Sequence, residues 1–194
     1  WRRYIDLRQD AERLRETEQR AALATTTDAV TGLLNRKGFA DQAQGMVDRL
    51  GDRQLAVISL QVQRLKQVSD RHGYEAGDSV RRTIAEALVR EAAAGAIVGR
   101  LSGDEFAIAL PLADADQASA ERLGEAVLRA VTRSYQLDGY MVEVGAFVGL
   151  SAANPGALRI PDLLRRADIA TDHARSARSA RPMWFDEGME RALI

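Results

Sequence analysis

A β-hairpin near the middle of the chain constrains the fold more than any other feature. Two short apolar segments, residues 96–101 and 105–110, are separated only by the polar turn Ser102-Gly103-Asp104. Such a turn between apolar segments is typical of two antiparallel strands, and glycine can supply the positive φ that tight turns need. The carboxylates of Asp104 and Glu105 are therefore expected at the tip of a hairpin.

The segments around this hairpin alternate between helical and extended patterns. Apolar residues are continuous or alternate where strands are expected, at residues 54–62, 142–151 and 182–185. Apolar residues recur every three or four positions where helices are expected, at residues 35–50, 76–93, 114–133 and onward from 161. The order β-α-β-β-α-β-α-β predicts an α+β domain, in which helices cover a mixed sheet with a split βαβ core.

A long polar helix is expected ahead of this domain. Residues 1–24 contain neither glycine nor proline and are rich in Arg and Glu. Their candidate heptad seam is Tyr4, Leu7, Ala11, Leu14, Glu18 and Ala21. A dimeric coiled coil and a solvated helix that packs on its own domain explain this spacing equally well. Residues 1–27 are therefore assigned to an N-terminal helix that can form a homodimer.

Composition excludes several classes of partner. Lys and Arg total 27 against 28 Asp and Glu, so the net charge of -1 offers no basic surface for a nucleic acid polymer or an anionic membrane. The chain has no cysteine, which excludes disulfides and thiolate metal sites and agrees with a reducing, cytoplasmic setting. No segment reaches the roughly 18 apolar residues that span a bilayer. Any membrane anchor is expected elsewhere in the parent protein.

Four motifs in order along the chain resemble those of GGDEF domains, the family of diguanylate cyclases. They comprise Asp28–Phe39, then Lys66–Asp70 with Gly77-Asp78, then the signature Ser102, Gly103, Asp104, Glu105 and Phe106, and finally Leu163–Arg175. The resemblance covers residues 28–186 and implies the mixed-sheet fold of nucleotidyl cyclases. It also implies that residues 187–194 are a linker towards a further domain, an EAL phosphodiesterase domain in a GGDEF-EAL composite protein.

The resemblance implies that the metal site of the family is degenerate in this chain. In active relatives, a carboxylate at the end of the first strand and another in the signature hairpin hold two magnesium ions over the triphosphate. In register with Lys66, the acids of the first strand fall on Gln61 and Gln63, so Asp104 is a remnant. Because Mg²⁺ is usually held by carboxylates together with substrate phosphates, no metal site and no required cofactor are expected, and Mg²⁺ would accompany only bound GTP.

The residues that bind the nucleotide in the family are also only partly retained. The guanine-binding asparagine of the family is the shorter Ser69 here, whereas Asp78 remains, although a helix cap explains Asp78 equally well. Arg175 replaces a phosphate-binding lysine, and Arg178 and Arg181 are open alternatives for a second cation. If GTP binds, the candidate residues are Lys66, Ser69, Asp78 and Arg175.

Three functions are compatible with these residues. The two glutamines favour a non-catalytic domain that transmits a signal from the N-terminal helix to a following domain in cyclic-di-GMP signalling. The second is a GTP sensor that binds the nucleotide without consuming it, and controls a downstream EAL phosphodiesterase. The third, least favoured, is a weak diguanylate cyclase. The product-inhibition motif Arg-x-x-Asp of the family is replaced by residues 93–96, so no feedback binding of cyclic-di-GMP is expected there.

Overall fold

A six-stranded mixed sheet lies at the centre of the computed structural model, which describes residues 2–113 and 116–191 and, for residues 2–6, the backbone alone. The strands are β1 (Gln54–Gln63), β2 (Ile97–Ser102), β3 (Glu105–Leu112), β4 (Arg133–Leu137), β5 (Tyr140–Ala153) and β6 (Met183–Trp184). They follow the order β2-β3-β1-β5-β4 with antiparallel neighbours, and β6 pairs in parallel with β5. The predicted α+β fold with a mixed sheet is confirmed.

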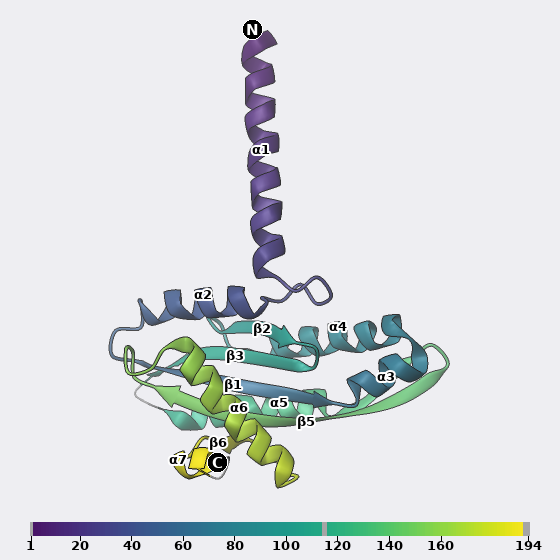
Figure 1. Cartoon of the computed structure of the whole chain (residues 1–194), viewed down its shortest axis with the longest axis vertical. Helices are drawn as coiled ribbons and strands as arrows, with labels where there is room; N and C mark the ends of the chain where they lie inside the picture. The colour runs from purple at the N-terminus through teal and green to yellow at the C-terminus, as the bar shows by residue number, and fades with distance from the viewer. Residues whose placement is uncertain (1, 114–115, 192–194) are drawn as a thin grey trace.

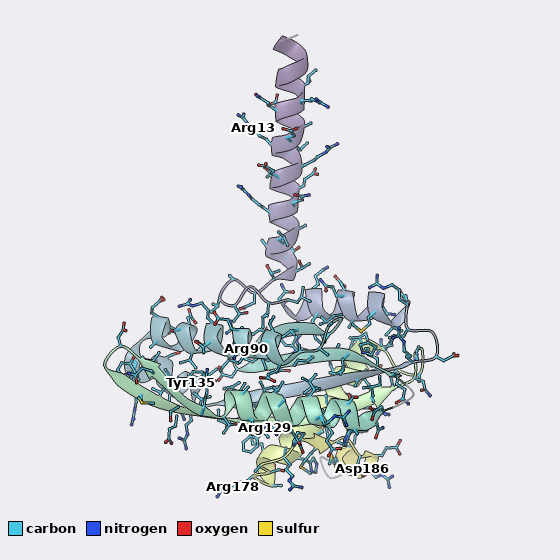
Figure 2. All side chains as sticks on the ribbon, turned by 180° about the vertical axis from the view of Figure 1, so that it is seen from behind. Arg13, Arg90, Arg129, Tyr135, Arg178 and Asp186 are labelled. Carbon is cyan, nitrogen blue, oxygen red and sulfur yellow. The ribbon has the colours of Figure 1, made fainter. Side chains whose placement is uncertain are left out.

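Helices cover both faces of this sheet. One face carries α2 (Arg36–Val47) and α6 (Ile160–Ser176), and the other carries α3 (Leu65–His72), α4 (Tyr74–Glu91) and α5 (Gln117–Val131). The helix α6 crosses in front of the sheet in Figure 1, whereas α5 lies in front of it in the reverse view of Figure 2. Both faces of β1 are therefore buried, which agrees with the mostly apolar sequence from Leu55 to Leu60.

The helix α1 (Arg2–Thr26) extends away from the sheet as a straight rod (Figure 1). Its side chains are exposed from Leu7 onwards, and Leu7 and Leu14 are 69% and 61% exposed. The helix does not pack along its own domain, so these apolar positions are left uncovered by the described part of the chain. Tyr4, the first residue of the predicted seam, lies outside the residues whose side chains are described. None of the described helices is long and apolar enough to cross a bilayer.

One strand was not expected from the sequence. The helix predicted over residues 114–133 begins at Gln117 and ends at Val131, while residue 114 lies outside the described part of the chain. Residues 133–137 instead form β4, which pairs with the start of β5. Tyr135 is buried between exposed neighbours. This alternation with a period of two is typical of a strand, so the helical pattern of the preceding residues does not continue here.

Two short helices also differ from the prediction. The first, α3, precedes α4, and Gly73, with a φ of 90°, separates them because this conformation is accessible to glycine and ends a helix. The second, α7 (Glu187–Arg191), lies where a linker was expected, and the backbone carbonyl of Met189 lies 3.3 Å from Nε2 of His173. The domain boundaries at residues 27/28 and 186/187 stay a prediction.

Candidate functional site

The signature residues form the tip of the β2–β3 hairpin beside the end of β1. Across the strands, Glu105 lies opposite Ser102 on one side and opposite Gln61 on the other. Phe106 is fully buried and anchors the hairpin in the core. Gly103 does not use the positive φ that glycine makes available, and the register of β2 on β3 shifts between Arg100 and Ser102.

An arginine on α4, Arg81, contacts the hairpin tip and the two acidic residues Asp78 and Asp104. Nη1 of Arg81 lies 3.0 Å from Oδ1 of Asp78, and its Nη2 lies 3.3 Å from Oδ1 of Asp104. Nε of the same side chain donates to the carbonyl of Gly103 at 3.4 Å. The Arg81 side chain is only 11% exposed, so a single buried cation engages both carboxylates.

A second arginine fixes the hairpin tip from the opposite side. Nε and Nη2 of Arg100 donate to the carbonyl of Gly103 at 3.1 and 2.9 Å, and its Nη1 contacts the Asp28 carboxylate at 3.0 Å. Burial alone would raise the pKa of Asp28, but hydrogen bonds from Thr31 and Arg100 outweigh it and hold this pKa below its ordinary value. The motif that begins at Asp28 therefore positions the hairpin electrostatically.

A cavity of about 390 Å³ lies between the hairpin tip, β1 and α6. It is lined by Ser59, Gln61, Ser102, Gly103, Asp104, Glu105, Asp168, Thr171 and Asp172. Oγ of Ser59 donates to Oδ1 of Asp168 at 2.6 Å. Burial raises the pKa of Asp168 to about 6, and the charge of Glu105 acts in the same direction. Asp168 belongs to the motif Leu163–Arg175, but it was not predicted as a site residue, because only the packing of α6 on β1 brings it beside the hairpin.

The residues in this cavity do not fit a catalytic magnesium ion. Gln61 supplies a neutral amide. Three of the four carboxylates that line the cavity are already paired with arginines: Asp104 with Arg81, Glu105 with Arg36, and Asp172 with Arg175. Within the described ranges, no group of three or more His, Asp and Glu side chains is placed to hold a metal ion. Magnesium usually requires anionic oxygen ligands before it releases its waters.

The four predicted nucleotide-binding residues do not share one open site. Lys66 is exposed on α3, and Arg175 is exposed and paired with Asp172 at 2.7 Å. The hydroxyl of Ser69 is buried without a hydrogen-bond partner. Asp78 lies in the second turn of α4, whose N-cap is Gly73, so the alternative that Asp78 caps this helix is wrong.

The space between Ser69 and Asp78 is filled by side chains. A Cβ atom added at Gly77 would collide with Oγ of Ser69 and would lie 2.9 Å from Nη1 of Arg81. Arg81 is not one of the residues that the resemblance singles out. It could have been found as a charged residue on the apolar side of a predicted helix, three positions after Asp78, where an ion pair within one helix is common.

A larger groove of about 1230 Å³ lies on the other side of the end of β1. Four arginines from three segments of the chain line it, namely Arg64, Arg129, Arg178 and Arg181, together with Gln63, Glu125 and Glu143. Figure 2 labels Arg129 on α5 and Arg178 after the end of α6. In the described part of the chain, Arg64 and Arg178 are the non-glycine residues with positive φ, at 72° and 49°. Strained backbone of this kind is concentrated at functional sites.

These features define the chain as a cyclase-like α+β domain with an acidic hairpin beside its central strand. Comparison with known proteins gives its family: the family model described as "Diguanylate cyclase, GGDEF domain" matches residues 25–181. The chain belongs to the GGDEF family. The sequence resemblance to GGDEF domains is thereby confirmed.

Relatives of known name are diguanylate cyclases and longer signalling proteins. The chain is 33% identical over 174 residues to the diguanylate cyclase TpbB of Pseudomonas aeruginosa, covering 87% of this chain and 40% of TpbB. It is 26% identical over 164 residues to MucR of the same species, a bifunctional diguanylate cyclase and cyclic di-GMP phosphodiesterase, covering 84% of this chain and 24% of MucR. The chain thus spans less than half the length of these relatives.

Solved structures of the family share the fold. The coiled coil and GGDEF domain of DgcB from Caulobacter crescentus, in complex with c-di-GMP, has a TM-score of 0.81 and 25% identity, covering 94% of this chain and 97% of that one. The GGDEF domain of TpbB, also called YfiN, from Pseudomonas aeruginosa has a TM-score of 0.75 and 30% identity, covering 86% and 98%.

Proposed function

We propose that this chain is a catalytically degenerate GGDEF domain that transmits a signal from α1 to a following domain in cyclic-di-GMP signalling. One observation carries this proposal: Gln61 takes the place of an acid beside the hairpin, while the remaining acid, Asp104, is paired within the domain. With an amide at Gln61 and Asp104 paired to Arg81, the pair of carboxylates that would hold two magnesium ions over a triphosphate is not available. The domain therefore needs no cofactor for its role.

The proposed direction of signalling follows from α1 and from the relatives. An exposed helix with unpaired leucines supports a homodimeric coiled coil, as in the DgcB fragment with its coiled coil. MucR combines cyclase and phosphodiesterase functions in one chain, and an EAL/GGDEF domain protein from M. capsulatus shares this fold at a TM-score of 0.66. These relatives support a covalently linked EAL domain after residue 186.

The test is an assay for product with the full chain. Purified protein is incubated with GTP and either Mg²⁺ or Mn²⁺, and cyclic-di-GMP is sought by chromatography. We expect none, both from the native chain and from Asp104→Ala. The TpbB GGDEF domain, assayed in parallel, serves as a positive control. Steady turnover that Asp104→Ala abolishes would refute the proposal.

A GTP sensor is the second candidate, and the arginine-lined groove favours it. Arg178 and Arg181 approach the end of β1 together with Arg64, so phosphates could be neutralised there by guanidinium groups instead of a metal. Calorimetry with GTP, in EDTA, tests this candidate. Submillimolar binding that Arg178→Gln with Arg181→Gln weakens would support it, whereas the exposed Arg133→Gln is the matched control. A weak cyclase is the least supported alternative, because it requires Gln61 to act as a neutral ligand.

A further inference from the structure

We propose that Arg81 is an internal cation that closes the nucleotide site of this domain from within. Its guanidinium lies between the acid at the hairpin tip and the acid on α4, where an external metal and a purine base would otherwise find their acceptors. The inference rests on the proposed function, because it concerns the same site. It adds a second barrier to ligand binding, which is independent of the missing acid at Gln61.

The contacts of Arg81 satisfy three acceptors at once. They are Oδ1 of Asp78 at 3.0 Å, Oδ1 of Asp104 at 3.3 Å and the carbonyl of Gly103 at 3.4 Å. Guanidinium presents five donors in a rigid plane and stays charged at any ordinary pH, so one side chain can bridge two carboxylates. Arg81 therefore neutralises both acids without help from a metal.

Burial makes this arrangement hard to displace. The Arg81 side chain is 11% exposed, whereas the Asp78 and Asp104 side chains are 29% and 31% exposed. A ligand that takes either carboxylate leaves a nearly buried cation short of a partner, and this loss is unfavourable because water reaches the guanidinium poorly. A metal ion at Asp104 would also bring a second positive charge next to the guanidinium, and the two would repel each other.

Close packing around Arg81 also fills the space that a ligand would need between α3 and α4. Nη1 of Arg81 and Oγ of Ser69 occupy the space beside Gly77, where a Cβ atom would lie 2.9 Å from Nη1 and would collide with Oγ. The buried Ser69 hydroxyl has no hydrogen-bond partner, so close packing at this position costs the protein a hydrogen bond. The space between α3 and α4 is thus occupied by the protein itself.

The next residue on the same helix provides a matched control. Arg82 is 45% exposed and pairs with Glu75, whose side chain is 91% exposed. Substitution of Arg82 removes the same charge from the same helix, but it leaves the contacts of the hairpin tip in place. General effects of net charge are thereby separated from the effect of Arg81.

The experiment restores the missing acid and then removes the internal cation. Mn²⁺ alone is titrated by electron paramagnetic resonance into the native chain, Gln61→Asp, Gln61→Asp with Arg81→Met, and Gln61→Asp with Arg82→Met. We expect Mn²⁺ binding to tighten at least about tenfold only when Arg81 is also replaced, because a like charge within about 4–6 Å shifts ion binding by this order. Equal affinities of Gln61→Asp and of its Arg81→Met combination would overturn the inference.

A second variant keeps the inference testable if the Arg81→Met protein does not fold. Arg81→Gln keeps hydrogen-bond donors at the site but removes the charge, and in the Gln61→Asp background it should tighten Mn²⁺ binding in the same way. Circular dichroism of each protein verifies the fold. The two proposals can fail separately. Formation of cyclic-di-GMP by the native chain would refute the proposal that the domain is catalytically degenerate, whereas the Mn²⁺ titration tests only the role of Arg81.

Discussion

Replacement of Asp168 by asparagine should stabilise the domain at neutral and alkaline pH. Asp168 lies on α6 beside the hairpin tip and accepts a hydrogen bond of 2.6 Å from Ser59. Burial, together with the charges of Glu105 and Asp172, raises its pKa from the ordinary 3.8 to about 6. Asparagine retains the oxygen that accepts from Ser59, but it carries no charge to desolvate.

The size of this effect follows from proton linkage. A difference of about two in pKa corresponds to about 3 kcal/mol, and because the side chain is only partly buried, screening reduces the expected gain to about 1–2 kcal/mol. The folded protein holds its proton more tightly than the unfolded chain. The stability that neutral Asp168 contributes is therefore fully present below about pH 4 and is lost as the pH rises through about 6.

Urea unfolding of the native chain and of Asp168→Asn, followed by circular dichroism at pH 4 and pH 8, measures this difference. The variant should be more stable than the native chain at pH 8, and the gain should shrink towards zero at pH 4. Asp162→Asn on the same helix is the control, because a hydrogen bond from Arg159 lowers the pKa of Asp162 and its replacement should bring no gain at pH 8. A variant that is less stable at pH 8, or equally shifted at both pH values, would show that the Asp168 charge is not desolvated.

Two further predictions concern packing and assembly. Gly149→Ala should lower the free energy of unfolding by about 1–3 kcal/mol, because a Cβ there would collide with the carbonyl of Ala167. Urea titrations measure this change, and an unchanged midpoint would contradict the packing of α6 on β5. Leu7→Asp with Leu14→Asp should convert a dimer of the full chain to a monomer in sedimentation experiments without changing the melting temperature of the domain, since both leucines are exposed in one chain. An unchanged mass would reject the coiled coil.

Much of the fold could be predicted because its signals are local. The polar turn around Gly103 identifies the hairpin, and the mostly apolar segment of β1 identifies a buried strand. The strand β4 was missed because residues 133–137 are recognisable only through their pairing with β5. The linker predicted after residue 186 contains α7, whose contact with His173 depends on how α6 ends.

The candidate site was less predictable, since its residues come from distant segments. Spacing and resemblance identify Asp78, Asp104 and Gln61, but they do not indicate which side chains face one another. The ion pairs of Arg81 with two carboxylates and the meeting of four arginines in one groove depend on the way α4, α5 and α6 pack on the sheet.

The amino-acid sequence by itself determined the family, the acidic hairpin and the presence of glutamines at positions 61 and 63, because each depends on a short stretch of neighbouring residues. Only the tertiary structure decided that the remaining acids are neutralised by Arg81, and that Asp168 is held where its pKa rises. Electrostatic interactions act through space over a few ångströms, so their outcome depends on distances that only the packed fold sets.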